Sequence, residues 1–98
     1  MPGKSYSKSR RICRVTFKLP PEVGAKTACL MGDFNDWSRK AHPLKKRKDG
    51  SFGVTVSLVA GRTYRYRFLL DGARWENDWQ AEGYVPNEFG TEDSIIRV

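Results

Sequence analysis

Three tryptophans stand outside the alternating apolar pattern that runs through most of the chain. Trp37 lies in a polar loop after a predicted strand, Trp75 follows an Asp-Gly turn, and Trp79 lies in an irregular polar segment. An indole in such surroundings is a candidate ligand contact. The alternative is an indole that folds back to cap the end of the domain, with its ring N–H bonded internally. The pattern favours a contact role for Trp37 and Trp75 and leaves both roles open for Trp79.

The chemistry that suits an exposed indole is stacking on a sugar ring. A flat, rigid indole packs against the C–H groups on the face of a pyranose at a small entropic cost. The hydroxyls around the ring then need hydrogen-bond partners, and Arg67, on the polar side of its strand, is a suitable donor. Two indole planes set at an angle can each take one glucose of a curved α-1,4 chain. The residue types therefore indicate a shallow carbohydrate site.

Carboxylates are abundant, but their positions do not indicate catalysis. Glycoside hydrolysis needs two carboxyl groups about 5–9.5 Å apart across the scissile bond, usually in a cleft. Asp33, Asp36 and Asp71 occupy turn positions instead, where aspartate stabilises the backbone conformation. A chain of 98 residues also has little material for a deep catalytic cavity. We expect a non-enzymatic module.

Basic residues dominate the charge, which is +7 overall. They concentrate near the N-terminus and in the run Lys45–Lys48, and such runs are typical of solvated faces or tails. Tyr64–Phe68 interleaves basic and aromatic residues, as base-stacking strips do. Its alternation, however, places the aromatics on one face and the arginines on the other. A nucleic-acid partner is not expected, and a basic nucleic-acid-binding β domain is kept as an alternative.

The two cysteines, Cys13 and Cys29, and the single histidine have no metal-ligand spacing. We expect buried, reduced thiols on strands, with a disulfide as the minor alternative. No apolar run approaches membrane-spanning length, and no hydrophobic signal region follows the basic N-terminal residues. These observations predict a cytoplasmic protein with no membrane contact, no metal and no cofactor.

Apolar and polar residues alternate with a period of two, which indicates strands rather than helices. The expected strands are approximately residues 12–19, 26–31, 44–47, 52–58, 64–70, 74–76 and 94–98. Turn signals at Asp49-Gly50, Ala60–Arg62 and Asp71-Gly72 separate them. Residues 33–43 and 77–93 are expected to be polar loops. The pattern predicts an all-β, antiparallel sandwich of immunoglobulin type over residues 11–98, preceded by a flexible basic tail over residues 1–10.

Four stretches together resemble the family 48 carbohydrate-binding modules, which include the isoamylase N-terminal early set domains and the glycogen-binding domain of the AMP-activated kinase β subunit. The stretches are Gly32–Trp37, Gly50–Phe52, Tyr64–Trp75 and Tyr84–Ile96. The resemblance covers nearly the whole chain from about Arg11. It implies an immunoglobulin-like sandwich of the early set type with a site for α-1,4-glucans such as glycogen, starch or maltooligosaccharides.

The resemblance also implies which residues bind the glucan: Trp37, Trp75, Arg67, Phe89, Thr91 and Asp93. The two tryptophans correspond to the stacking platform, and Arg67 corresponds to a basic residue that is usually lysine in the kinase subunits. Asp93 departs from the family, which has a hydrogen-bonding asparagine there. An aspartate accepts hydrogen bonds from hydroxyls but cannot donate as an amide does.

Domains of this kind are usually appended to hydrolases or branching enzymes. A glycogen-metabolising enzyme is therefore a further expected partner beside the α-glucan itself. The alternative function is an interaction or regulatory module that recruits such an enzyme or a kinase.

Overall fold

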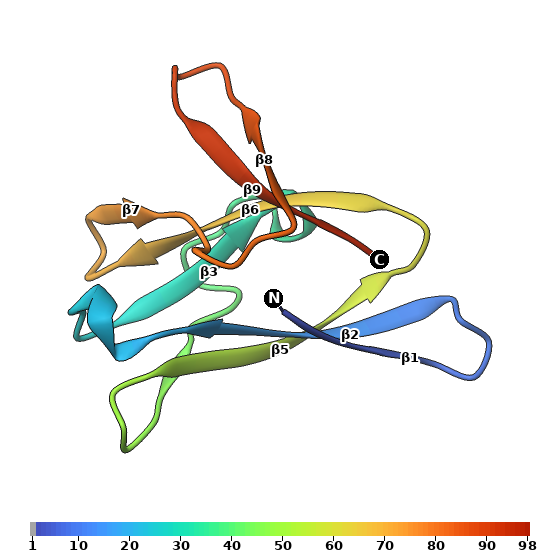
Figure 1. Cartoon of the computed structure of the whole chain (residues 1–98), viewed down its shortest axis with the longest axis horizontal. Helices are drawn as coiled ribbons and strands as arrows, with labels where there is room; N and C mark the ends of the chain where they lie inside the picture. The colour runs from blue at the N-terminus through green and yellow to red at the C-terminus, as the bar shows by residue number, and fades with distance from the viewer. Residues whose placement is uncertain (1) are drawn as a thin grey trace.

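The computed structural model describes residues 2–98 and consists of two antiparallel sheets that face each other (Figure 1). The first sheet has the strand order β1 (Gly3–Tyr6), β2 (Ile12–Leu19), β5 (Phe52–Val59) and β4 (Lys45–Lys46). The second sheet has the order β3 (Ala28–Gly32), β6 (Thr63–Leu70), β9 (Glu92–Arg97) and β8 (Gly83–Pro86), and β7 (Arg74–Glu76) also pairs with β6. The predicted all-β, immunoglobulin-like sandwich of the early set type is confirmed.

Alternation along β2 and β6 builds the core between the sheets. Every second residue of β2 from Cys13 to Leu19 is buried, and the same holds for β6 from Tyr64 to Leu70. Phe17 and Tyr66 meet across the two sheets, with ring centroids 4.8 Å apart in an edge-on arrangement. The inward residues fill the core, and the outward residues of each sheet, some of them covered by neighbouring side chains as Leu69 is, form the outer faces.

Two predictions about irregular segments need correction. Gly3–Tyr6, placed in the flexible tail, forms β1 and pairs with β2 over all four residues. Its side chains are exposed, so no apolar period marks it; backbone pairing and an ion pair between Lys4 and Glu82 hold it instead. Gly83–Pro86, placed in a polar loop, forms the edge strand β8.

The two thiols are free, and they differ in burial. Cys13 is fully buried in β2, as predicted, whereas Cys29 in β3 is only partly buried. The edge of β3 is covered by the chain near Pro43, which bridges to Cys29. Over residues 2–98, no helix is long and apolar enough to cross a membrane. The helical elements among the described residues are two short 3-10 turns, η1 (Pro21–Val23) and η2 (Asp33–Asn35).

A buried polar network ties the connection between β7 and β8 to the core. The Tyr66 hydroxyl donates a hydrogen bond of 2.7 Å to Oδ2 of Asp78, and the backbone N–H of Asp78 donates to Oγ of Ser94 at 3.0 Å. Ser94 Oγ in turn donates to Oδ1 of Asn77 at 2.8 Å. Burial and the neighbouring Asp78 carboxylate raise the pKa of Tyr66 far above its ordinary value. This network fixes the start of the segment that carries Trp79.

Candidate functional site

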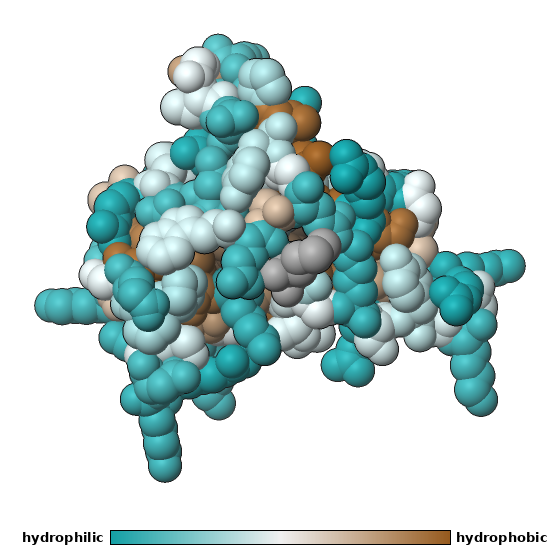
Figure 2. Space-filling model, viewed as in Figure 1, coloured by the Kyte–Doolittle hydropathy of each residue, from teal (hydrophilic) through white to brown (hydrophobic). Residues whose placement is uncertain are grey.

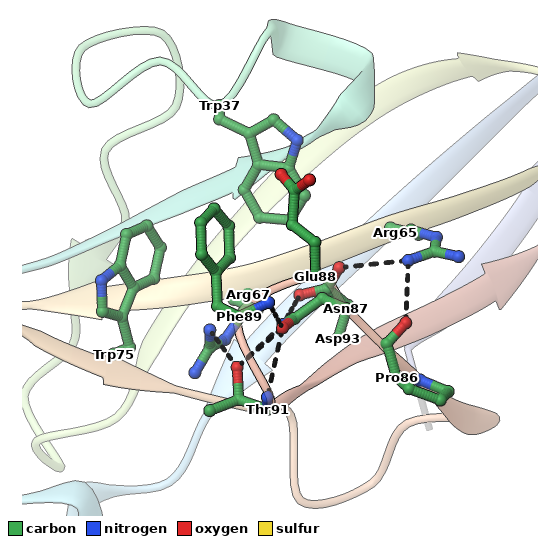
Figure 3. Close-up of a pocket in the computed structure, with 10 residues that line it drawn as sticks. All are labelled: Trp37, Arg65, Arg67, Trp75, Pro86, Asn87, Glu88, Phe89, Thr91 and Asp93. Atoms are coloured by element: carbon green, nitrogen blue, oxygen red, sulfur yellow. Dashed lines mark hydrogen bonds and ion pairs between the residues drawn. The ribbon is translucent and has the colours of Figure 1, made fainter.

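A groove with a volume of about 1020 Å³ lies on the outer face of the second sheet, the face turned away from the core (Figure 3). It is lined by Trp37, Arg65, Arg67, Trp75, Pro86, Asn87, Glu88, Phe89, Thr91 and Asp93. All the residues predicted for the glucan site are among them. The lining comes from the loop after β3, the strands β6, β7, β8 and β9, and the loop between β8 and β9.

The hairpin of β6 and β7 positions Trp75. Asp71 and Gly72 both have left-handed backbone conformations, with φ of 53° and 70°, which closes the predicted turn. Oδ1 of Asp71 accepts hydrogen bonds from the backbone N–H groups of Lys26 and Thr27 at 2.8 and 3.0 Å. Those bonds lower the pKa of Asp71 and dock the turn onto the segment before β3. Trp75 follows three residues later, opposite Leu69, and is 41% exposed.

Arg67 lies beside Trp75 on the same outer face. The guanidinium carbon of Arg67 is 5.2 Å from the centroid of the Trp75 ring, within the range of a cation–π contact. Nη1 of Arg67 is 3.5 Å from Oγ1 of Thr91. Nε of Arg67 is buried and has no hydrogen-bond partner over residues 2–98. The guanidinium is thus held mainly by stacking, with little hydrogen bonding to other side chains.

The loop after β3 positions Trp37, which is partly buried. Asp36 and Trp37 both have positive φ, 54° and 55°, so the chain reverses sharply at this point. The backbone N–H of Trp37 donates to the Gly32 carbonyl at 2.9 Å. Position 32 requires glycine because the backbone of β6 lies close to it: a Cβ on Gly32 would lie 2.6 Å from the Arg65 carbonyl oxygen. The turn is braced by Asn35, whose Nδ2 donates to the Leu30 carbonyl at 3.0 Å.

The loop between β8 and β9 is organised by Asn87. Oδ1 of Asn87 accepts hydrogen bonds from the backbone N–H groups of Phe89 and Thr91, at 3.0 and 3.2 Å. Nδ2 of Asn87 donates to Oγ1 of Thr91 at 2.8 Å and to Oδ1 of Asp93 at 3.1 Å. Gly90 closes the loop with φ of 79°. Phe89 is thereby held at the tip with 80% of its surface exposed, and Figure 3 shows its ring on the same side of the groove as Trp75.

Asp93 lies at the floor of the groove and is only 5% exposed. Its Oδ1 accepts from Asn87, and its Oδ2 lies 3.6 Å from Nη1 of Arg65. The carboxylate is therefore engaged by neighbouring side chains. It holds an amide and a guanidinium that also line the groove, and its direct contact with a glucan stays a prediction.

The groove also contains residues that the sequence reasoning did not select, namely Arg65, Asn87, Glu88 and Pro86. Arg65 alternates with Arg67 on the polar side of β6, so the same period that marked Arg67 could have marked it. Asn87 lies six residues before Asp93. This spacing alone does not predict that an asparagine in the loop contacts an aspartate on the strand.

Trp79 does not line the groove. It is 53% exposed, and its indole Nε1 donates to Oε1 of Glu76 at 3.0 Å. The carboxylates predicted at turns are likewise outside: Asp33 accepts from the backbone N–H of Arg65 at 3.2 Å, and Asp71 braces the β6–β7 turn. Over residues 2–98, no group of three or more His, Cys, Asp or Glu side chains is arranged to hold a metal ion.

Comparisons with known proteins find relatives among kinase subunits and glucan branching enzymes. The chain is 33% identical over 75 residues to subunit beta-2 of mouse 5'-AMP-activated protein kinase, covering 76% of this chain and 26% of that protein. It is 40% identical over 53 residues to the 1,4-alpha-glucan branching enzyme GlgB of Mesorhizobium japonicum, covering 51% of this chain and 7% of that enzyme. A branching enzyme GlgB of Aquifex aeolicus is 33% identical over 67 residues.

The match to the kinase subunit spans about a quarter of that protein, and the matches to the branching enzymes span smaller shares, 7% and 10%. The similarity is thus to one segment of much longer chains. Residues 14–98 match the family described as the glycogen recognition site of AMP-activated protein kinase, so this chain belongs to that family.

Proposed function

We propose that this chain is a non-catalytic module that binds α-1,4-glucans such as glycogen in the groove on the second sheet. The observation that carries the proposal is the juxtaposition of Trp37, Trp75 and Phe89 around one open groove whose polar side is formed by two arginines and an asparagine. Aromatic faces for C–H stacking and adjacent donors for hydroxyls are the two requirements of a sugar site. Membership of a family described as a glycogen recognition site supports it independently.

The aromatic residues have the roles of stacking surfaces in this proposal. Trp75 of β7 supplies the indole face that is not covered by Arg67, and Trp37 supplies a second indole from the loop after β3. Phe89, at the loop tip, contacts the chain between or beside them. Since these rings come from the strand β7 and two braced loops, they are presented with a small entropic cost of ordering them on binding.

The hydrogen bonds to sugar hydroxyls come from Arg67, Arg65 and Asn87. The amide that the family has at the position of Asp93 is supplied by Asn87, whose Nδ2 lies 3.1 Å from the Asp93 carboxylate. Asp93 and Thr91 accept the two hydrogen bonds from Nδ2 and hold that amide in place, and a glucan hydroxyl has to replace one of these acceptors. The site therefore keeps an amide donor despite the aspartate at position 93.

The proposal of a non-catalytic role is supported by the carboxylates of the groove. Only Glu88 and Asp93 line it, and Asp93 is buried among its own hydrogen-bond partners. The general acid and base of a glycosidase have to face the scissile bond. Incubation of the chain with amylopectin should produce no new reducing ends. Two relatives are 1,4-alpha-glucan branching enzymes, which supports a role in presenting glucan to a glycogen-metabolising enzyme. The cytoplasmic location stays a prediction.

Co-sedimentation with glycogen tests the proposal, using Trp37→Ala, Trp75→Ala and the matched control Trp79→Ala. The first two variants should stay in the supernatant, and the control should pellet with glycogen like the parent. Circular dichroism of each variant establishes that the sandwich is intact. If either groove variant pellets as the parent does, the proposed platform is wrong. If Trp79→Ala alone abolishes pelleting, the site lies on another face.

A further inference from the structure

Positive charge is divided unequally between the two sheets. Residues 3–19 and 45–59, which form the first sheet and its turns, contain ten of the 18 basic residues and only Asp49 of the 11 acidic ones. The rest of the chain, which includes the groove, has slightly more acidic than basic residues. The overall charge of +7 is therefore a property of the first sheet, on the opposite side of the sandwich from the groove.

The basic side chains of this sheet gather on its outer face. Lys18 of β2 and Lys45 of β4 flank Gly53 of β5, with which both are paired in register. The Arg47 side chain lies over Gly53, since a Cβ on that glycine would lie 2.6 Å from Nη2 of Arg47. We call Arg14, Lys18, Lys45 and Arg47, with the outward serine and threonine residues between them, the basic face.

A shallow hollow with a volume of about 500 Å³ opens at this place. Its lining includes Lys45, Arg47, Lys48, Gly53 and Thr55, and it contains no carboxylate. Figure 2 shows that the hydrophilic side chains projecting from the body include some where Figure 1 places the turns of the first sheet. Cationic side chains thus converge on a surface that a flat ligand can reach.

The basic face has few counter-charges: hydrogen bonds from Ser51 and the nearby charge of Arg47 lower the pKa of Asp49, the carboxylate beside this face. Over residues 2–98 the ion pairs are Lys4–Glu82 and Arg65–Asp93, and neither involves a residue of this face. The nearest carboxylate in sequence, Asp49, accepts hydrogen bonds from the backbone N–H and the hydroxyl of Ser51 at 2.9 and 2.6 Å. Like charges held together repel one another, and an anionic partner relieves that repulsion.

The other end of the same face is apolar. Ile12 and Val59 are paired in register on the outer side of β2 and β5 and are 37% and 47% exposed. Between them and Lys18, Thr16 and Thr55 face outward together, with their hydroxyls 3.0 Å apart. The outward positions of β2 and β5 carry no aromatic ring, so the face has no platform for stacking bases. An exposed apolar pair beside a basic row is complementary to a polypeptide rather than to a nucleic acid.

We propose that the outer face of the first sheet docks an acidic polypeptide segment that carries an apolar residue at one end. The acidic side chains pair with Lys18, Lys45 and Arg47, and the apolar residue packs on Ile12 and Val59. Ile12 and Lys18 lie six residues apart on one strand, which is about 20 Å at the rise of a β-strand. An extended segment of about seven residues spans the face. Because the groove lies on the other sheet, such a segment and a glucan bind at the same time.

Fluorescence anisotropy with labelled peptides tests this docking. The probe is a leucine followed by six glutamates, and the comparison probes are a seven-nucleotide single strand and phosphatidylserine vesicles. The parent should bind the peptide more tightly than either comparison probe, with affinity falling as salt rises. Lys18→Glu combined with Lys45→Glu should weaken peptide binding at least tenfold. Ile12→Ser combined with Val59→Ser should weaken it at least threefold, with no effect on a probe of glutamates alone.

A matched control separates docking on this face from general attraction to a basic protein. Lys40→Glu combined with Arg62→Glu makes the same change in net charge at exposed positions outside the face and should change peptide affinity less than twofold. An equal loss in the control and the Lys18/Lys45 variant would overturn the proposal. Tighter binding of the oligonucleotide or the vesicles than of the peptide would overturn the assigned partner class. Glycogen co-sedimentation of the Lys18/Lys45 variant should match the parent, so failure here is distinguishable from failure of the glucan site.

Discussion

The guanidinium carbon of Arg67 lies 5.2 Å from the centroid of the Trp75 ring, although the two residues come from different strands of the β6–β7 hairpin. A cation on one face of an indole leaves the other face for a ligand, and it restricts the rotation of both side chains. The hairpin therefore presents the indole and a hydrogen-bond donor as one rigid unit. In a site on an open surface, such preorganisation contributes to affinity because less freedom is lost on binding.

Replacing Arg67 with methionine should weaken glucan binding about 5- to 30-fold. Methionine keeps the apolar stem but removes the cation–π contact and one hydrogen-bond donor, which together contribute about 1–2 kcal/mol. Titration calorimetry with maltoheptaose measures the loss. Arg67→Lys, which restores a cation and a donor, should recover part of the affinity, and Arg62→Met should bind like the parent. If the Arg67→Met variant bound glucan with unchanged affinity, Arg67 would not contribute to the site.

The alternating residues of β2 and β6 are sufficient to predict the sandwich, because burial on one side of a strand leaves a period of two in the sequence. The turn at Asp71 and Gly72 is predictable for a local reason, since both residues tolerate positive φ. The strand β1 is not predictable in this way. All its residues are exposed, so only backbone pairing with β2 defines it.

The groove was predictable in its aromatic residues and less so in its polar ones. Trp37 and Trp75 can be identified from the sequence because each is a large apolar residue within a polar segment. Asn87, in contrast, acquires its position through contacts with Thr91 and Asp93 that depend on how the β8–β9 hairpin folds. The resemblance predicts Asp93 as a glucan contact, and the structure adds its contacts with Asn87 and Arg65, which spacing alone does not predict.

Replacing Asn87 with alanine should loosen the loop that holds Phe89. The variant loses the acceptor for the N–H groups of Phe89 and Thr91 and the donor to Asp93. We expect faster amide hydrogen exchange at residues 88–91 and a loss of glucan affinity at least as large as that of Phe89→Ala. Glu88→Ala leaves the bonds of Asn87 intact, so its exchange rates should match those of the parent. Unchanged exchange in Asn87→Ala would show that Gly90 and the backbone alone define the loop.

Replacing Tyr66 with phenylalanine should lower the free energy of unfolding at pH 7 by about 1–3 kcal/mol. The change leaves Oδ2 of the buried Asp78 without the hydroxyl that donates to it at 2.7 Å. Urea denaturation measures the difference. Trp75 and the groove are on the other face of the sheet, so glucan affinity of the folded variant should stay within about twofold of the parent. A stability equal to that of the parent would mean that another group satisfies Asp78.

The same variant tests the alkaline stability of the fold. Burial raises the pKa of Tyr66 in the folded state above the value of about 10 for an unfolded tyrosine. The folded state therefore holds the phenolic proton more tightly, and this contribution is complete below about pH 10 and lost as pH rises further. The stability of the parent should fall above pH 10 more steeply than that of Tyr66→Phe. Parallel curves for the two proteins would contradict this linkage.

Asp71 predicts a dependence of stability on acid pH. Hydrogen bonds from the backbone N–H groups of Thr27 and Lys26 lower its pKa in the folded state. Its contribution to stability is therefore present above the unfolded value of about 3.9 and is lost as pH falls through the folded value. Asp71→Asn keeps an acceptor oxygen and tolerates the positive φ of 53° at this position. The variant should lose less stability than the parent between pH 5 and pH 2, measured by thermal unfolding.

Asp71→Ala, which lacks the acceptor, should be less stable than the asparagine variant at every pH, because the β6–β7 turn then loses its attachment to the segment before β3. If parent and Asp71→Asn lost stability equally on acidification, the side-chain bonds at this turn would not be what lowers the pKa of the carboxyl group.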